Sequence, residues 1–378
     1  MKAPPSRLLA RLDAALAKTR DPIEAACVRA ERAGFLARQG YVDEAKSEIA
    51  SLHAQFAGKV QPSISVWLCI VEGWLAHYGS MSAAARDKMK RAAALSAASR
   101  LTRLHALSVA WLAHMDYVQQ DIDALARNAA LALELAAPDH HAARARVCLV
   151  IGTAYHFADR MDLAQPWYAA AREHGHADGD KAMLTALIFN MASLHASHAI
   201  LAAVFGGDAD GEARRALASA LSAGNFDQWI GTVSLNALVP MLRAVVASVQ
   251  GQHGAALELY EAHWADAQRQ GLARAAANVL ADMAWCHWHL GHVDRAAVQA
   301  HAAAASIDAA MDPDDRAIAN GRLAQLFKLL GDDDRALCHL RAGKDDLALH
   351  RKLQARVVDA LQHLKRCEVE RQIRTRPC

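Results

Sequence analysis

The chain has few aromatic residues, few prolines and no excess of one charge. Only 6% of its 378 residues are aromatic and only 9 are proline, whereas 53% are hydrophobic, and alanine supplies much of that share. Small apolar residues without β-branched runs favour closely packed helices over sheets. Lys and Arg number 42 against 40 Asp and Glu, interspersed along the chain. The composition therefore predicts an all-α protein with no nucleic-acid partner.

Long apolar runs and targeting signals are also missing. Apolar stretches such as residues 67–76 are broken by Glu72 and are shorter than the ~20 residues that a membrane span requires. The N-terminus has no uninterrupted apolar segment of the kind found in export signals. We therefore expect a cytoplasmic protein that does not contact a membrane.

The sequence lacks the motifs of the common metal, phosphate and nucleophile sites. The 7 cysteines are odd in number, widely spread and without a C-x-x-C pair, which disfavours a disulfide framework and a zinc knuckle. In the densest histidine cluster, Cys286, His287, His289 and His292 do not converge on one point of a helix. No phosphate-binding glycine loop, nucleophile elbow or H-E-x-x-H helix is present. We expect no cofactor, no bound metal and no enzymatic activity.

What the sequence does contain is a repeat of about forty residues. Turn-like residues separate pairs of helical patterns at this spacing, namely Gly40, Gly79, Gln119, Asp159, Gly251, Gly291 and Gly331. The spacing slips in the fifth unit, where residues 205–211 indicate a lengthened loop. An alanine follows seven of the eight breakers by five residues, the exception being the breaker near Gly207 in the fifth unit. A small side chain at this position lets two helices cross closely; the alanines are Ala45, Ala84, Ala124, Ala164, Ala256, Ala296 and Ala336.

The fourth unit has the clearest repeat pattern, formed by Gly152, Tyr155, Asp159, Arg160, Met161, Ala164, Tyr168 and Ala171. Its order of small, aromatic and turn residues resembles the tetratricopeptide (TPR) repeat, and the resemblance covers roughly residues 31–342. The period exceeds the standard TPR length of about 34, and the unit-ending proline is mostly absent. Both features resemble the TPR-like regulatory superhelices of bacterial signalling proteins, such as TPR-type diguanylate cyclases and maltose-regulon-activator-like regulators.

This resemblance implies an α-solenoid of about eight helical hairpins in a right-handed superhelix, with the first helix of each pair lining a concave groove. We expect the repeats to span residues 1–344 and a long C-terminal helix to span residues 345–378, capped by Asp345 and Asp346. Its apolar stripe comprises Leu353, Val357, Leu361, Leu364 and Cys367. The helix is either a cap that shields the last repeat or a signalling helix, and it offers a route to a homodimer.

Carrying the register of the fourth unit to the others predicts the residues of the concave groove. They are Arg38, His77, Asp116, Tyr117, His156, Phe157, Asn278, Trp285, Trp288, His289, Arg322 and Lys328. Aromatic rings on such a face anchor a peptide or flat ligand, and nearby cations bind its carboxylates. The alternative is that Trp285 and Trp288 pack against the neighbouring repeat.

These observations predict a non-catalytic TPR-like scaffold or sensor that binds a protein or peptide partner, or a small signal molecule, in a bacterial-type regulatory system. The alternative is the ligand-sensing portion of a larger signalling protein, such as a diguanylate cyclase or a transcription activator. A helical hydrolase or metalloprotein is favoured only by the 20 histidines. The carboxylate-clamp pattern of co-chaperone TPRs is not recognisable, which disfavours a receptor for chaperone tails.

Overall fold

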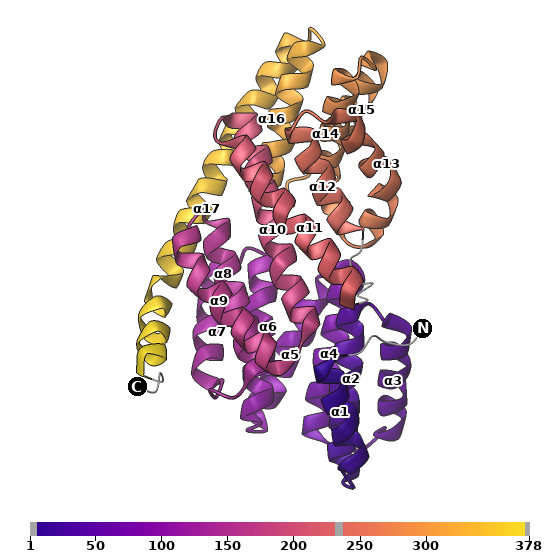
Figure 1. Cartoon of the computed structure of the whole chain (residues 1–378), viewed down its shortest axis with the longest axis vertical. Helices are drawn as coiled ribbons and strands as arrows, with labels where there is room; N and C mark the ends of the chain where they lie inside the picture. The colour runs from indigo at the N-terminus through magenta and orange to yellow at the C-terminus, as the bar shows by residue number, and fades with distance from the viewer. Residues whose placement is uncertain (1–5, 231–236, 375–378) are drawn as a thin grey trace. The chain divides into compact units, whose positions relative to one another are not determined.

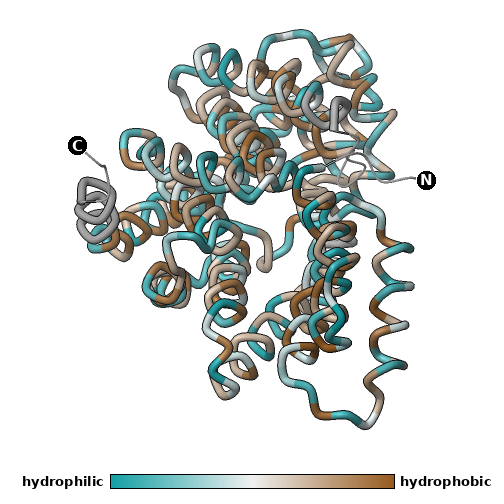
Figure 2. Tube along the Cα trace, turned by 60° about the horizontal axis from the view of Figure 1, so that its bottom comes forward, coloured by the Kyte–Doolittle hydropathy of each residue, from teal (hydrophilic) through white to brown (hydrophobic). Residues whose placement is uncertain are grey.

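The protein is built from α-helices. The structure is a computed structural model that describes residues 6–230 and 237–374. Within these ranges it has seventeen α-helices, one short 3-10 helix and no strand (Figure 1). Brown and teal alternate along the helices when the trace is coloured by hydropathy, which is the pattern of amphipathic helices that bury one face (Figure 2). The all-α prediction is confirmed.

The helices divide into two compact units. Unit 1 contains α1 (Arg7–Lys18), α2 (Pro22–Gln39), α3 (Val42–Gln55), α4 (Pro62–Ser80), α5 (Ala84–Ala98), α6 (Thr102–Val118), α7 (Ile122–Leu135), α8 (His141–Phe157) and α9 (Met161–Asp178). Unit 2 contains α11 (Ala209–Ile230), α12 (Leu238–Val249), α13 (His253–Arg269), η1 (Leu272–Ala275), α14 (Ala276–His289), α15 (Val293–Ala305) and α16 (Pro313–Leu329). Helices α10 (Lys181–Phe205) and α17 (Asp333–Arg374) are divided between the two units, and the last two residues of α11, Trp229 and Ile230, belong to unit 1.

Eight helix pairs follow one another along the chain, from α2 and α3 to α16 and α17. A residue with a positive φ angle makes the tight turn inside the pairs, at Gly40, Met81, Gln120, Asp159, Gly251, Gly291 and Gly331. The prediction of about eight stacked hairpins is confirmed. The second turn lies two residues later than expected, because α4 continues through Gly79 to Ser80.

The alanines after the turns are buried, as expected for closely crossing helices. Six of the seven are at most 7% exposed, namely Ala45, Ala124, Ala164, Ala256, Ala296 and Ala336. Ala84 is exposed, and Ala85 is buried in its place, because the turn before it lies two residues later than predicted. In the fourth pair, a Cβ atom added to Gly152 would lie 2.9 Å from the Tyr168 ring. This position therefore requires the small residue of the TPR pattern.

The fifth pair differs from its prediction. The lengthened loop expected at residues 205–211 is a short turn, since α10 ends at Phe205 and α11 begins at Ala209. The Asp208 side chain caps α11 by accepting a hydrogen bond from the backbone N–H of Gly211 at 2.9 Å. The additional residues of this unit lie in the helices, which have 25 and 22 residues. The spacing slipped because the helices are long.

Helix α10 is long and apolar enough to span a membrane by length and composition. One such helix is weak evidence for a span, because core helices of soluble proteins have the same properties. Two of its alanines, Ala196 and Ala199, pack in unit 2 against Ala213, Ala216 and Val246. The absence of membrane contact stays a prediction.

The C-terminal helix starts earlier than expected. Asp345 does not begin a new helix, because α17 runs without a break from Asp333. The second helix of the eighth pair and the predicted C-terminal helix are therefore one element. Val357, Leu361 and Leu364 of its apolar stripe are at most 4% exposed, so the chain itself covers these side chains; the Cys367 side chain lies outside the described residues. This burial favours the capping interpretation, and the homodimer stays a prediction.

Candidate functional site

The predicted groove residues of unit 1 do not form one surface. Arg38 forms an ion pair with Asp180, and its guanidinium lies over the Trp74 ring at 4.9 Å. The Nε2 atoms of His77 and His114 are 3.3 Å apart. These contacts place Arg38 and His77 where the first helices of the pairs face one another.

Two other predicted residues of unit 1, Asp116 and His156, contact the second helices of the pairs. Asp116 is fully buried, and it accepts hydrogen bonds from Arg86 of α5 and Asn128 of α7. His156 is 1% exposed and bonds to Tyr168 of α9. These two side chains were expected on the open groove, and the structure instead places both in the interior, between first and second helices. Tyr117 and Phe157 meet edge to face, with ring centroids 6.3 Å apart.

In unit 2, several of the predicted groove residues lie close to one another. The Arg322 guanidinium lies 4.5 Å above the Trp285 ring, and the His289 ring lies 4.5 Å from that ring on its edge. Asn278, earlier on the same helix, donates a hydrogen bond to Asp315 at 2.7 Å. These four residues share one side of α14 and α16. Whether they bind a partner stays a prediction.

Trp288 and Lys328 lie apart from this group. Trp288 is partly buried and packs against the core that includes Leu323, Leu326 and Phe327. Lys328 is exposed and pairs with Asp333 at 2.7 Å across the turn of the eighth pair. Trp285 packs against the same core, so the packing interpretation offered for the tryptophans describes both of them.

A row of two neighbouring indoles with an arginine at each end crosses the first helices of unit 1. It comprises Arg38 of α2, Trp74 of α4, Trp111 of α6 and Arg146 of α8. The two indole centroids are 5.3 Å apart, and the Arg146 guanidinium lies 3.6 Å above the Trp111 ring. Cations over indole faces are attracted by the negative charge of the ring face. We call this row and the space beside it the indole–arginine pocket.

Other segments of unit 1 complete the pocket. Its lining includes Leu8 of α1, Glu31 of α2 and Met183 of α10, and its free volume is about 30 Å³. Asp178 and Asp180 lie at the junction of α9 and α10, where Asp178 pairs with Arg11 at 2.8 Å. The first helices of unit 1 therefore do not face an empty channel at this point, because α1 and the start of α10 pack against them.

The electrostatics of this pocket are unusual for a protein interior. Arg146 is 3% exposed, hydrogen-bonds Tyr78, and has no ion-pair partner among the described residues. Burial lowers its pKa. Burial and the neighbouring Asp178 raise the pKa of Glu31 to about 6, although Arg11 and Arg38 oppose this shift. A buried cation without a carboxylate next to it is costly unless other groups compensate.

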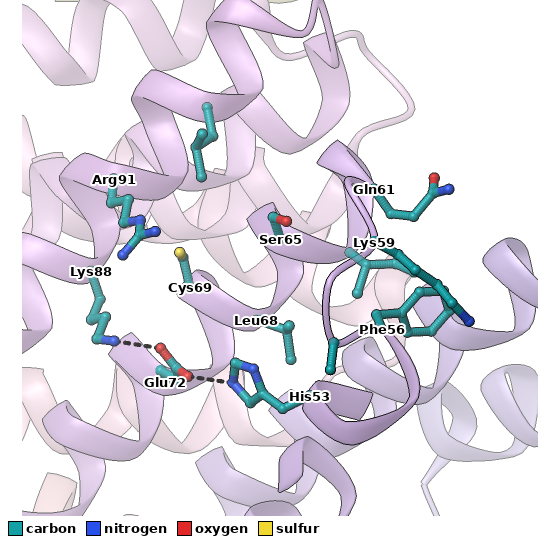
Figure 3. Close-up of a pocket in the computed structure, with 13 residues that line it drawn as sticks. His53, Phe56, Lys59, Gln61, Ser65, Leu68, Cys69, Glu72, Lys88 and Arg91 are labelled. Atoms are coloured by element: carbon teal, nitrogen blue, oxygen red, sulfur yellow. Dashed lines mark hydrogen bonds and ion pairs between the residues drawn. The ribbon is translucent and has the colours of Figure 1, made fainter. Parts of the chain in front are cut away.

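A second, larger cavity lies between α3, α4 and α5 of unit 1, with a volume of about 280 Å³. Figure 3 shows Ser65, Leu68 and Cys69 of α4 between Arg91 on one side and Phe56 on the other. Leu68 and Cys69 are less than 9% exposed, so the floor is apolar and fixed. We call this cavity the α3–α5 groove.

The rim of the α3–α5 groove is basic. Lys59, Lys88 and Arg91 line it together with one carboxylate, Glu72, which gives a net formal charge of +2 from three cations and one anion. Glu72 is fully engaged, because it bonds to Lys88 at 2.5 Å and to His53 at 2.8 Å (Figure 3). Burial opposes ionisation of Glu72, but these two hydrogen bonds lower its pKa. Arg91 has no ion-pair partner among the described residues.

Trp74, Trp111 and Arg146 were missed because the register of the fourth unit was applied at the same position along each first helix. The helices α2, α4, α6 and α8 start 40, 40 and 39 residues apart, but the row at residues 38, 74, 111 and 146 advances by 36, 37 and 35. Each member therefore lies about one helical turn nearer its helix N-terminus than the one before. A search for aromatic and basic residues spaced 35 to 37 residues apart, which is shorter than the repeat, would find the row.

Sequence comparison identifies no relatives for this chain. No family model matches it, and no curated protein gives a significant match. Solved structures do resemble it. A Rap protein crystallised in complex with competence and sporulation factor has a TM-score of 0.54 and 12% identity, with 91% of this chain and 92% of that chain covered.

Two further solved structures align over most of the chain. The apo form of RapI has a TM-score of 0.45 and 10% identity over 91% of this chain and 92% of that one. Yeast Tom70 has a TM-score of 0.41 and 13% identity over 98% of this chain and 86% of that one. Together, the Rap complex and the eight helix pairs show a TPR-like helical repeat fold.

Proposed function

We propose that this protein is a non-catalytic, cytoplasmic TPR-like scaffold or sensor that binds a protein or peptide partner in a bacterial-type regulatory system. The observation that carries the proposal is the α3–α5 groove, which combines an apolar floor with a basic rim. The Rap structure, a complex with competence and sporulation factor, supports the ability of such folds to hold a separate molecule. The docking segment is acidic and carries one large apolar side chain.

The dimensions of the groove favour a protein segment. A volume of about 280 Å³ suits a single anchoring side chain, and such anchors in well-packed pockets contribute most of the energy of a protein interface. Ile64 and Leu68 form an apolar bed for the anchor. Val60, in the connection that also contributes Lys59, is 90% exposed and adds apolar area beside the rim.

The charges of the groove select the chemistry of the segment. Within residues 6–230 and 237–374, the exposed Arg91 has no ion-pair partner, and the hydrogen bond of the Lys59 side chain goes to the backbone oxygen of Gln55, with its ammonium over the Phe56 ring. Both cations are therefore available to carboxylates, which arginine binds in bidentate fashion. Complementary charge at a rim speeds association and excludes basic partners more than it adds affinity.

Fluorescence anisotropy with short labelled peptides tests this proposal on the full chain. One peptide carries a Leu flanked by Glu, a second carries the same Leu flanked by Lys, and a third replaces the Leu of the first by Ala. The first peptide is expected to bind most tightly. Arg91→Glu should weaken it about tenfold, as expected for a like charge opposite an acidic partner.

Lys90→Glu is the matched control, since Lys90 lies on the same helix, is exposed and does not line the groove. It should change the affinity by less than about twofold, as is usual for screened surface charges. Equal binding of the acidic and basic peptides, or equal loss in both variants, would refute the groove as the docking site.

A further inference from the structure

Three residues that line the indole–arginine pocket each have a buried N–H group with no hydrogen-bond acceptor among the described residues. These groups are Nε of Arg38, Nε of Arg146 and Nε1 of Trp74. They come from three different helices, α2, α8 and α4. A buried donor left without an acceptor destabilises the fold, and more so when the donor is charged. Three such donors around one cavity indicate a missing acceptor with several lone pairs.

The carboxylates beside the pocket already have partners. Asp180 accepts from Arg38 and from the backbone N–H of Met183, and Asp178 accepts from Arg11. These interactions leave the three N–H groups unsatisfied. Among the described residues, no carboxylate lies within 4 Å of the Arg146 guanidinium, whereas Arg38 and Arg11 each pair with one carboxylate. When Glu31, the remaining carboxyl on the lining, is neutral, the site lacks one negative charge as well as an acceptor.

The pocket has room for this acceptor. Its free volume of about 30 Å³ exceeds the ~10–15 Å³ that a single water needs and suits a group of a few heavy atoms. Glu31, on its lining, is partly exposed, so the pocket is reached from solvent on that side. An oxyanion meets all three requirements, since it supplies negative charge, several acceptor lone pairs and small size.

We propose that the indole–arginine pocket binds a small oxyanion, a carboxylate or a phosphate, through the N–H groups of Arg38, Trp74 and Arg146. The site is separate from the α3–α5 groove and does not depend on the function proposed for that groove. The indole faces of Trp74 and Trp111 hold the two guanidinium groups in place. The bound group is either a free anion or the carboxylate of a larger ligand that enters past Glu31.

Glu31 acts as the internal competitor of the ligand. Its carboxyl lines the same pocket, and the charged groups that act on it are Asp178, Asp180, Arg11 and Arg38. Its pKa of about 6 means that it is mostly ionised at pH 7.5 and mostly neutral at pH 5.5. Oxyanion binding is therefore stronger at the lower pH, and Glu31→Gln strengthens it at the higher pH.

The test is the rise in Tm of the full chain with inorganic phosphate, sulfate or acetate, measured against chloride at matched ionic strength. Saturation of the rise with concentration gives an apparent affinity. Arg146→Met measures the general salt effect, because sulfate and phosphate stabilise proteins without binding a site. Trp74→Phe removes one neutral donor and keeps the aromatic core, so it remains informative if Arg146→Met does not fold.

We expect Arg146→Met to abolish the saturable rise, and Trp74→Phe to weaken the affinity about threefold to tenfold, the effect of one hydrogen bond. Glu31→Gln should increase the affinity for the anion at least threefold at pH 7.5. This change corresponds to about 0.7 kcal/mol, which is typical of a screened like charge. A gain of binding cannot arise from damage to the fold. The larger response to acetate or to phosphate identifies the class of oxyanion. Two results would overturn the proposal. One is a rise in Tm at pH 5.5 that is no larger with phosphate, sulfate or acetate than with chloride, both in wild type and in Glu31→Gln. The other is a Trp74→Phe variant whose rise in Tm saturates at the same anion concentration as in wild type.

Discussion

Arg146 of unit 1 and Arg322 of unit 2 both lie over an indole ring, and the groups around them differ. Arg322 is 2% exposed and pairs with the buried carboxylate of Asp282 at 3.1 Å. Asp282 also accepts the Tyr260 hydroxyl at 2.8 Å. Arg146 is about as buried, but in the part of the chain that the structure describes it has no carboxylate within 4 Å and no acceptor for its Nε.

This difference separates a structural element from a binding site. In unit 2 the charge of the arginine is neutralised by the chain itself, so the network of Asp282, Arg322 and Tyr260 joins α13, α14 and α16. In unit 1 the fold positions the arginine and leaves one of its N–H groups unused. Unsatisfied buried polar groups are rare in folded proteins, and a bound ion or water is one explanation for them. The three around the indole–arginine pocket differ from the others in this chain because their residues line one cavity.

The largest effect on stability is expected when the network of Asp282, Arg322 and Tyr260 in unit 2 is broken. Asp282→Ala leaves the Arg322 cation buried and unpaired, and it also removes the acceptor of the Tyr260 hydroxyl. Removal of one partner of a buried ion pair costs about 3–5 kcal/mol. The free energy of unfolding, measured by urea denaturation, should fall by this amount for the transition of unit 2.

Two variants sharpen this prediction. Asp266→Ala, which breaks the exposed pair with Arg269, should cost less than about 1 kcal/mol. Arg146→Met removes an unpaired buried cation and should change the free energy of unfolding by no more than about 1 kcal/mol, since the lost cation–π contact opposes the relief of desolvation. A loss in Arg146→Met as large as that in Asp282→Ala would erase the distinction between the two units.

An intermediate effect on stability is expected where a glycine lets two helices approach closely, which occurs in both units. A Cβ atom at Gly34 of α2 would overlap the Trp74 ring, and one at Gly321 of α16 would overlap Val204 of α10. Gly34→Ala should therefore lower the free energy of unfolding by about 1–3 kcal/mol, the usual cost of overpacking a core. Thermal or urea unfolding measures it.

Gly79 of α4 provides the control in the same unit, because a Cβ atom there meets nothing within 4 Å. Gly79→Ala should be neutral or stabilising by up to about 1 kcal/mol, owing to the better helix propensity of alanine. Equal destabilisation by the two substitutions would show that the indole of Trp74 does not set the approach of α4 to α2.

The repeat architecture could be predicted from the sequence because its signals are local. A left-handed turn favours glycine, as at Gly40 and Gly291, and a close crossing requires a small residue, as at Ala164. The turn at Met81 was placed two residues early because Met81, which carries a Cβ atom, adopts the left-handed conformation that glycine was expected to supply. The left-handed conformation of a residue such as methionine cannot be inferred from a single sequence.

The candidate sites were harder to predict because they depend on how the helices rotate and stack. The register brought Trp285 and Arg322 into contact and placed Arg38 on the lining of a pocket, and their part in binding a partner stays a prediction. Asp116 and His156 were expected to face outward and instead bond to second helices, since a small rotation of a helix moves a side chain from one neighbour to another. The pairing of Arg38 with Asp180 joins residues 142 positions apart, which no repeat pattern contains.

The smallest effect concerns the pH dependence that Glu31 confers on unit 1. Its pKa of about 6 in the folded protein lies above the usual value near 4.3, so the folded state binds more protons than the unfolded state between these values. By linkage, its contribution to stability is fully present below about pH 4.3 and is lost as pH rises through about 6. Glu31→Gln removes this loss and should therefore gain stability relative to wild type as pH rises through the window, by less than about 1 kcal/mol because a partly exposed carboxyl is screened.

The comparison with wild type at each pH also cancels the buried histidines, which act in the opposite direction. Burial lowers the pKa of His140 and of His174 to about 4, so these groups destabilise the fold as pH falls below about 6.5 in both proteins. Urea midpoints at half-unit steps of pH measure the difference that remains. A difference that does not change with pH would mean that Glu31 ionises as an ordinary surface carboxyl, and the competition between Glu31 and an oxyanion in the indole–arginine pocket would then lose its pH dependence too.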